Sequence, residues 1–82
     1  MHFVYLLRSV VDGSFYIGRT EDLERRLKEH NSGEGYYTRR KRPYGLIYYE
    51  AYKELEEAKE REKQIKRFGS AYSALLKRLK LK

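Results

Sequence analysis

The sequence predicts a small α+β fold in which a three-stranded antiparallel sheet is flanked by helices, in the order β-β-α-β-α-α. Two β-rich runs, residues 3–8 and 15–18, enclose the turn signal Asp12-Gly13 and therefore predict an antiparallel hairpin. A third β-rich run, residues 46–52, supplies the remaining strand. The segments between and after these runs carry apolar residues at helical spacing, which predicts helices that cover the sheet.

The first helix is predicted to run from an N-cap at Thr20 to about His30. Threonine is a favourable cap, and the two acidic residues that follow it suit the positive end of the helix dipole. Leu23 and Leu27 are one turn apart and are expected to face inward. The run Asn-Ser-Gly at residues 31–33 ends the helix, because glycine readily adopts the left-handed conformation found after helices.

Two further helices complete the predicted fold. Residues 53–67 place Leu55, Ala58 and Ile65 on one stripe, and this helix is expected to end near residues 68–69. Ser70 can cap a short last helix, whose apolar side is formed by Tyr72, Leu75, Leu76 and Leu79. The chain contains no internal repeat, linker or low-complexity segment, so we interpret residues 1–82 as a single domain.

Composition narrows the classes of function. The 82 residues include 19 Lys plus Arg and 12 Asp plus Glu, and this net charge of +7 favours a polyanionic partner, with a solubilising surface as the alternative. The absence of cysteine excludes disulfides, thiolate metal sites and cysteine nucleophiles, and the two histidines are too few for a histidine-rich zinc site. No apolar run is long enough to cross a bilayer and no signal-peptide pattern begins the chain, so we expect a cytoplasmic protein without a membrane partner.

Glu62 is the most informative residue, because it interrupts an apolar stripe. It follows Ala58 by four residues and precedes Ile65 by three, so it lies on the face predicted to point toward the core. A carboxylate in such a place costs several kcal/mol unless it is paired or coordinated. It could hold a hard divalent cation together with water and phosphate oxygens. The alternatives are an internal ion pair with Arg26, or a rotated helix that brings Glu62 to solvent.

Four more residues could build a polar site together with Glu62. Arg26 and His30 are neighbours on one helix face, where a guanidinium can clamp a phosphate and an imidazole can move a proton; a solvated charged face is the alternative. Tyr5 and Tyr16 lie inside the two strands of the hairpin, where aromatic residues usually serve packing. A functional role requires their hydroxyls to converge beside a cation that stabilises the ionised form.

The loop at residues 36–42 interleaves aromatic residues with cations, a combination that can stack bases and hold phosphates. A flexible solvated loop is the alternative. The candidate contacts in this loop are Tyr37, Arg39, Arg40, Lys41 and Arg42. The basic run at residues 77–82 is interpreted as a solvated helix end.

Four blocks of the sequence, taken in order, resemble the GIY-YIG nuclease domain, in particular its small stand-alone bacterial members. The second signature triplet is intact as Tyr16-Ile17-Gly18, whereas the first appears as Val4-Tyr5-Leu6 and keeps only its central tyrosine. The family's helix motif is similar to residues 22–30, and its metal-binding helix is similar to residues 61–66. The resemblance covers nearly the whole chain.

This resemblance implies phosphodiester hydrolysis with one divalent metal, Mg²⁺ or Mn²⁺, which Glu62 would bind. It implies that Arg26 holds the scissile phosphate and the charge that develops in the transition state. Tyr5 would act as the general base for the attacking water, or would orient it, with support from Tyr16. His30 would assist near the phosphate or the nucleophile.

The resemblance also implies contacts with nucleic acid, with DNA as the expected substrate and RNA as the alternative. Gly18 would let the backbone pass close to the site, Arg19 would add a phosphate contact, and Lys66 is a further candidate contact on the metal-binding helix. The sequence departs from the family in the first triplet. It also has no asparagine after the metal-binding helix.

The leading hypothesis from the sequence is a metal-dependent DNA endonuclease that selects its substrate by structure rather than by base sequence. Base readout requires elements that enter a groove, and we identify no additional DNA-reading domain. The alternatives are a nucleic-acid-binding module with weak or no catalysis, and a nuclease subunit of a larger assembly. A role in DNA repair is an expectation at the level of the family alone.

Overall fold

The computed structural model describes residues 1–34, 39–67 and 69–81, and it confirms the predicted α+β fold and element order. The chain forms β1 (His2–Ser9), β2 (Phe15–Thr20), α1 (Leu23–Ser32), β3 (Tyr44–Tyr52), α2 (Leu55–Arg67) and α3 (Gly69–Arg78). No helix within the described residues is long and apolar enough to span a membrane.

The sheet is antiparallel, and its strand order β2-β1-β3 places β1 in the centre. This position follows from the sequence of β1, whose residues 4–7 form a continuous apolar run instead of an alternating one. All four of these side chains are buried, because helices cover both faces of the sheet. In the register, Tyr5 lies opposite Gly18 on β2 and opposite Tyr49 on β3.

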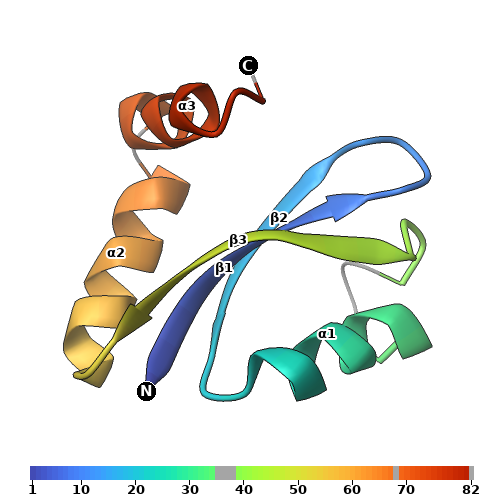
Figure 1. Ribbon diagram of the computed structural model, residues 1–82, viewed down its shortest axis with the longest axis horizontal. Helices are drawn as coiled ribbons and strands as arrows, with labels where there is room; N and C mark the ends of the chain where they lie inside the picture. Colours follow the sequence, from blue (N-terminus) through green and yellow to red (C-terminus); the bar gives the residue numbers. More distant parts are fainter. Residues whose placement is uncertain (35–38, 68, 82) are drawn as a thin grey trace.

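The helices form separate layers on the two faces of the sheet (Figure 1). On one face, α2 and α3 pack through Ala58, Ile65 and Leu75 against Val4. On the other face, α1 packs against a second cluster, formed by the buried residues Tyr5, Leu7 and Tyr44 and the partly buried residues Tyr16, Leu23 and Leu27. The sheet therefore separates the helix that carries Arg26 and His30 from the helix that carries Glu62.

The ends of α1 differ in part from the prediction. The N-cap is Asp22 and not Thr20: the Asp22 side chain accepts a hydrogen bond from the backbone N–H of Arg25 at 3.0 Å. Thr20 instead ends β2, and its Oγ1 accepts a bond from the backbone N–H of Asp22 at 3.1 Å. Thr20 and Asp22, two residues apart, could each cap the helix, but Thr20 is held as the last residue of β2. The predicted C-terminal end of the helix is confirmed, since α1 ends at Ser32 and Gly33 follows in the left-handed conformation with φ +90°.

The other elements match the prediction with small shifts at their ends. β3 begins at Tyr44, α2 begins at Leu55, and α3 already begins at Gly69, so Ser70 lies within α3 and is not its N-cap.

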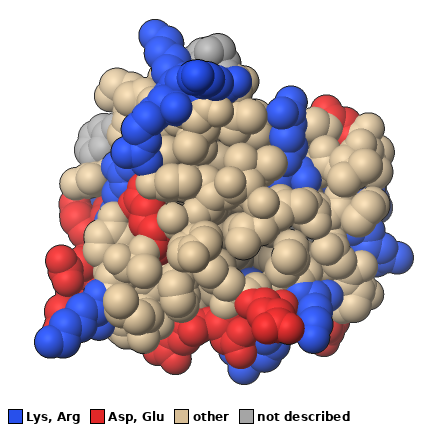
Figure 2. Space-filling view, viewed as in Figure 1, with Lys and Arg blue, Asp and Glu red and all other residues tan. Residues whose placement is uncertain are grey.

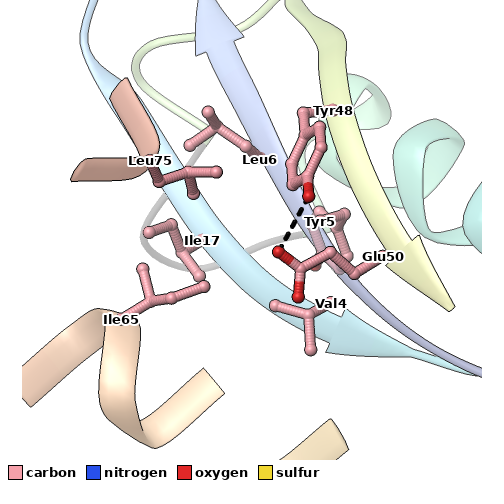
Figure 3. Close-up of a pocket in the computed structure, with 8 residues that line it drawn as sticks. All are labelled: Val4, Tyr5, Leu6, Ile17, Tyr48, Glu50, Ile65 and Leu75. Carbon is pink, nitrogen blue, oxygen red and sulfur yellow. Dashed lines mark hydrogen bonds between the residues drawn. The ribbon is translucent and has the colours of Figure 1, made fainter. Parts of the chain in front are cut away.

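The core between the sheet and α2–α3 is filled, because the cavity that remains there measures only about 10 Å³ (Figure 3). Such a volume is at the lower limit for one water molecule.

A carboxylate at the edge of this core, Glu50 on β3, ties the sheet to α2. Its oxygens accept two hydrogen bonds from the Arg61 guanidinium, at 2.9 and 3.1 Å, and bonds from the hydroxyls of Tyr48 and Tyr52 at 2.9 and 2.5 Å. Figure 3 shows the Tyr48 contact at the margin of the filled core. Burial alone would raise the pKa of Glu50, but the bonds from Arg61 and the two tyrosines hold this pKa below its usual value.

Candidate active site

Three rings from three elements converge on the α1 face of the sheet. Tyr5 on β1 and His30 on α1 form a hydrogen bond of 3.0 Å between the tyrosine hydroxyl and Nε2. The rings of Tyr16 and His30 meet edge to face with their centroids 4.8 Å apart, and the rings of Tyr5 and Tyr16 are 6.4 Å apart. The sequence predicted that these residues could share a site, and the structure brings them together.

Gly18 makes room for the Tyr5 hydroxyl. Tyr5 and Gly18 are directly paired across β1 and β2, so their side-chain positions share one face. A Cβ atom at position 18 would overlap the hydroxyl end of Tyr5, and it would lie 3.1 Å from a ring carbon of Tyr16. The glycine of the intact triplet therefore lets the Tyr5 side chain lie across the edge strand β2.

The surroundings keep both partners of this hydrogen bond neutral near pH 7. Burial raises the pKa of Tyr5 to about 12, although a hydrogen bond with Arg26 opposes the shift and the charge of Glu62 adds to it. Burial also lowers the pKa of His30, and the neighbouring charge of Arg26 lowers it further. His30 is only 1% exposed, which explains why desolvation is the leading cause.

Arg26 lies between these rings and the surface. Its guanidinium donates to the Glu29 carboxylate at 3.2 Å, and its side chain is 33% exposed. Arg26 also hydrogen-bonds to Tyr5 and lowers the pKa of this tyrosine. The helix spacing thus places Arg26 beside the site as predicted, while its acidic partner is Glu29 on the same helix.

Glu62 lies on the α2 side of β2, whereas the three rings lie on the α1 side. Its carboxylate is held by two cations. Arg19 Nε donates to Oε1 at 3.3 Å, and Lys66 Nζ donates to Oε2 at 2.9 Å. The side chain is 19% exposed, so it lies at the margin of the core and is neither enclosed nor fully solvated. The alternative of an ion pair with Arg26 is wrong, because α1 and α2 cover opposite faces of the sheet.

Glu62 and the tyrosine cluster are nevertheless parts of one neighbourhood around the edge strand β2. The charge of Glu62 makes a small contribution to the raised pKa of Tyr5, after burial and the charges of nearer groups. Arg19, the partner of Glu62, directly follows Gly18 in the strand. The neighbourhood therefore combines two tyrosines, one imidazole, the carboxylate of Glu62 and the cations Arg19, Arg26 and Lys66.

The donor set suits one type of metal site. Within the described part of the chain, no three His, Asp or Glu side chains gather into a group that could hold an ion by themselves. Glu62 offers a single hard carboxylate next to cations that can bind phosphate. This set fits a hard divalent cation whose other ligands are water and phosphate oxygens.

The basic loop lies at the end of the sheet that holds the hairpin turn and the last turn of α1, where the Arg42 side chain lies over Gly33. Lys41 pairs with Asp12 at 3.3 Å, and its carbonyl accepts a 2.6 Å bond from the Ser9 hydroxyl, so the loop lies beside the hairpin turn. Arg39, Arg40, Lys41 and Arg42 are exposed there. Tyr37 lies outside the described residues.

A groove adjoins the site along β2, between the sheet, α2 and α3. Its volume is about 400 Å³, and it is lined by Phe15, Tyr16, Ile17, Ile65, Lys66 and Tyr72. Tyr16 and Lys66 belong both to this groove and to the neighbourhood of Glu62. The groove could not be predicted from the sequence, because Phe15 and Tyr72 come together only through tertiary packing.

Charge is distributed around the margin of the face seen in Figure 2. Lys and Arg side chains gather near α3, and acidic side chains gather along the edge formed by the start of α2 and the start of α1. The centre of this face is uncharged. The net charge of +7 is therefore not concentrated in a single patch on this face.

Comparisons with known proteins agree with this geometry. The family model described as the GIY-YIG catalytic domain matches residues 1–74. A UPF0213 protein of Staphylococcus saprophyticus is 41% identical over 69 residues, which span 83% of both chains. A UPF0213 protein of Staphylococcus aureus is 43% identical over 68 residues, 82% of both chains.

A solved structure is also similar. The solution NMR structure of a UPF0213 protein from Bacillus halodurans matches 96% of this chain and 84% of its own chain, with 40% identity and a TM-score of 0.59. The family match covers the tyrosines, Arg26, His30 and Glu62, and the relatives have similar lengths. From this match and from these relatives it follows that the chain belongs to the GIY-YIG nuclease family.

Proposed function

We propose that this chain is a divalent-metal-dependent endonuclease that hydrolyses phosphodiester bonds in DNA. The observation that carries the proposal is the hydrogen bond between Tyr5 and His30, placed beside Arg26 and within electrostatic range of Glu62. Nucleases of this family generally use divalent metal ions. Mg²⁺ or Mn²⁺ held by Glu62 would supply a Lewis acid that binds the scissile phosphate and stabilises the leaving oxygen.

In the proposed mechanism Tyr5 and His30 move the proton of the attacking water. Tyr5 is a weak base by itself, because it is neutral at pH 7 with a pKa of about 12. If Nδ1 of His30 carries the ring proton, Nε2 accepts the hydrogen bond from the Tyr5 hydroxyl. As water attacks phosphorus, its proton passes to the Tyr5 oxygen while the tyrosine proton passes to Nε2. Tyr16 packs against the imidazole and keeps it in place.

Arg26 is proposed to hold the phosphate. A guanidinium can bind two phosphate oxygens at once and can stabilise the negative charge that builds up on them as the P–O bonds form and break. Its contact with Glu29 limits the directions in which the side chain can point. The phosphate is then held close to the Tyr5 hydroxyl, to which Arg26 is already hydrogen-bonded.

Substrate selection is proposed to depend on structure. The groove beside Tyr16 is lined by aromatic rings and has a volume of about 400 Å³, which is ample for one nucleobase. Stacking on an aromatic ring tolerates any base and requires an unstacked one. We therefore expect single strands, ends or branched DNA to be preferred over a continuous duplex.

A cleavage panel tests the proposal. Labelled duplex, single-stranded, flap and branched DNA and one RNA are incubated with Mg²⁺, Mn²⁺ or EDTA. Cleavage is expected only with metal, and it should be lost in Glu62→Ala and Arg26→Ala. The matched controls Glu57→Ala and Arg25→Ala alter exposed neighbours on the same helices and should cleave normally.

The same panel separates the competing functions. If the chain binds the nucleic acids without cleaving them, and Glu62→Ala binds them equally well, the chain is a nucleic-acid-binding module. Cleavage that appears only with a co-purified protein would show a subunit of a larger assembly. Cleavage that persists in EDTA would contradict the role of the metal.

A further inference from the structure

Glu62, the proposed metal ligand, is engaged on both of its oxygens. Arg19 reaches Oε1 from β2, and Lys66 reaches Oε2 from the next turn of α2. One negative charge is thus bracketed by two positive charges. This arrangement explains how a carboxylate can interrupt the apolar stripe of α2.

The same arrangement opposes the binding of a divalent cation by the free protein. A cation that takes Glu62 as a ligand competes with the two donors for the carboxylate oxygens, and it lies beside both positive groups. Within the described residues, no group of three His, Asp or Glu side chains gathers there to hold the ion by itself. Phosphate can offset the repulsion between the ion and the two positive groups, because it adds negative charge and offers acceptors to both donors.

Both cations have the freedom to change partners. The side chain of Arg19 is 33% exposed and that of Lys66 is 50% exposed, so neither is locked in the core. Arg19 follows Gly18, over which the Tyr5 hydroxyl lies, and Lys66 lines the groove next to Tyr16. Lys66 therefore lies between Glu62 and the groove, and Arg19 lies on the edge strand β2, whose residues 15–17 line that groove.

We propose that Arg19 and Lys66 exchange between two partners: they hold Glu62 in the free protein and move to the substrate phosphate when nucleic acid binds. The exchange releases the carboxylate, so that a divalent ion and a phosphodiester bind cooperatively. Glu62 is thereby protected from metal when no substrate is present. The inference rests on the proposed function only in its assumption that Glu62 is the metal ligand.

The test measures metal binding without catalysis. Free Mn²⁺ is titrated by its EPR signal against the wild type, Arg19→Gln, Lys66→Gln and the double variant, with and without a short phosphorothioate oligodeoxynucleotide. Each single variant is expected to bind Mn²⁺ about two- to fivefold more tightly, the range that a partly exposed ion pair supports. The oligonucleotide should tighten Mn²⁺ binding in the wild type more than in the double variant.

Two controls make the result specific. Lys63→Gln removes an exposed lysine from the same helix and should leave Mn²⁺ affinity unchanged. Glu62→Gln should abolish Mn²⁺ binding in every background, so that the signal of free Mn²⁺ is undiminished by the protein. Thermal unfolding confirms that each variant is folded.

Several outcomes would overturn the inference. Unchanged or weaker Mn²⁺ binding in Arg19→Gln and Lys66→Gln, or an equal effect of Lys63→Gln, would show that the two cations do not compete with metal. Absence of Mn²⁺ binding by every variant, with or without oligonucleotide, would also contradict it. Mn²⁺ binding that survives Glu62→Gln would place the metal elsewhere, whereas the cleavage panel would still decide whether the chain is a nuclease.

Discussion

At the scale of single residues, the site depends on a close contact between a glycine and a tyrosine. The Tyr5 hydroxyl occupies the space that a side chain at position 18 would need. The hydroxyl can therefore reach His30 and Arg26 only if position 18 lacks a Cβ atom. This steric requirement gives a physical reason for the glycine in the triplet Tyr16-Ile17-Gly18.

Gly18→Ala is accordingly expected to displace Tyr5 and to reduce cleavage strongly. Overpacking of this kind costs about 1–3 kcal/mol, to be measured by urea unfolding. The loss of stability should be smaller when alanine is introduced into a Tyr5→Phe background, because part of the overlap involves the hydroxyl. Gly45→Ala is the control, since a Cβ at that position meets no atom within 4 Å. Equal effects at both glycines would contradict this explanation.

His30 gives the fold a defined pH dependence. Its pKa is lower in the folded protein than its ordinary value of 6.5, because burial and Arg26 disfavour the charged ring. The unfolded chain therefore binds more protons below this pH, and the free energy of unfolding falls as the pH drops through about 6.5. His30→Gln should flatten this part of the profile in urea titrations at pH 5 to 8. A profile that His30→Gln does not change would contradict the assignment.

At the scale of elements, the relation between α2 and the sheet decides where Glu62 lies. The neighbouring residue Arg61 is clamped by Glu50 from β3, and Glu50 also accepts the hydroxyls of Tyr48 and Tyr52. The side chains of Glu50 and Arg61 are 13% and 26% exposed, so screening by solvent is limited. This clamp fixes the rotation of α2, and hence it directs Glu62 toward β2.

Breaking this clamp should destabilise the fold and weaken Mn²⁺ binding together. Glu50→Gln and Arg61→Gln are each expected to cost roughly 2–3 kcal/mol, below the range for a fully enclosed pair. Because the folded pKa of Glu50 is depressed, its contribution is present above about pH 4.5 and is lost as the pH falls; Glu50→Gln should reduce this acid sensitivity. Glu56→Gln, in an exposed pair with Lys59, should cost less than about 0.5 kcal/mol.

At the scale of the whole molecule, charge is spread over several surfaces. Arg19 and Lys66 lie beside Glu62, whereas Lys41 lies beside the hairpin turn and Arg42 lies over Gly33 at the end of α1. A strand of nucleic acid could contact both the proposed site and residues 39–42. It would then run along the length of β2. The net charge of +7 would then act through contacts at both ends of the sheet.

Affinity for DNA should therefore fall as salt is raised. Arg39→Gln combined with Arg40→Gln should reduce the slope of log affinity against log salt by about 1–2, because up to two phosphate contacts are lost. Lys28→Gln combined with Lys59→Gln removes the same charge from helix positions paired with glutamates and should change the slope less. Equal changes in slope, measured by fluorescence anisotropy, would show that net charge alone matters.

Much of the fold could be predicted from local patterns in the sequence. The hairpin around Asp12-Gly13 and the stop at Gly33 depend on residues that are close in the chain, and the structure confirms both. The choice of Asp22 over Thr20 as the cap could not be predicted, because it depends on where β2 ends. The family match likewise supports the resemblance that the motifs carried.

Local patterns suffice to predict the elements, the family and the residues proposed for catalysis, because periodicity, turn signals and motifs are properties of short segments. Which charges meet depends instead on how the elements pack in three dimensions. Glu62 pairs with Arg19 and not with Arg26, because the sheet lies between α1 and α2. The clamp on Glu50 and the groove beside Tyr16 likewise depend on strand order and helix packing, which join residues that are distant in the chain.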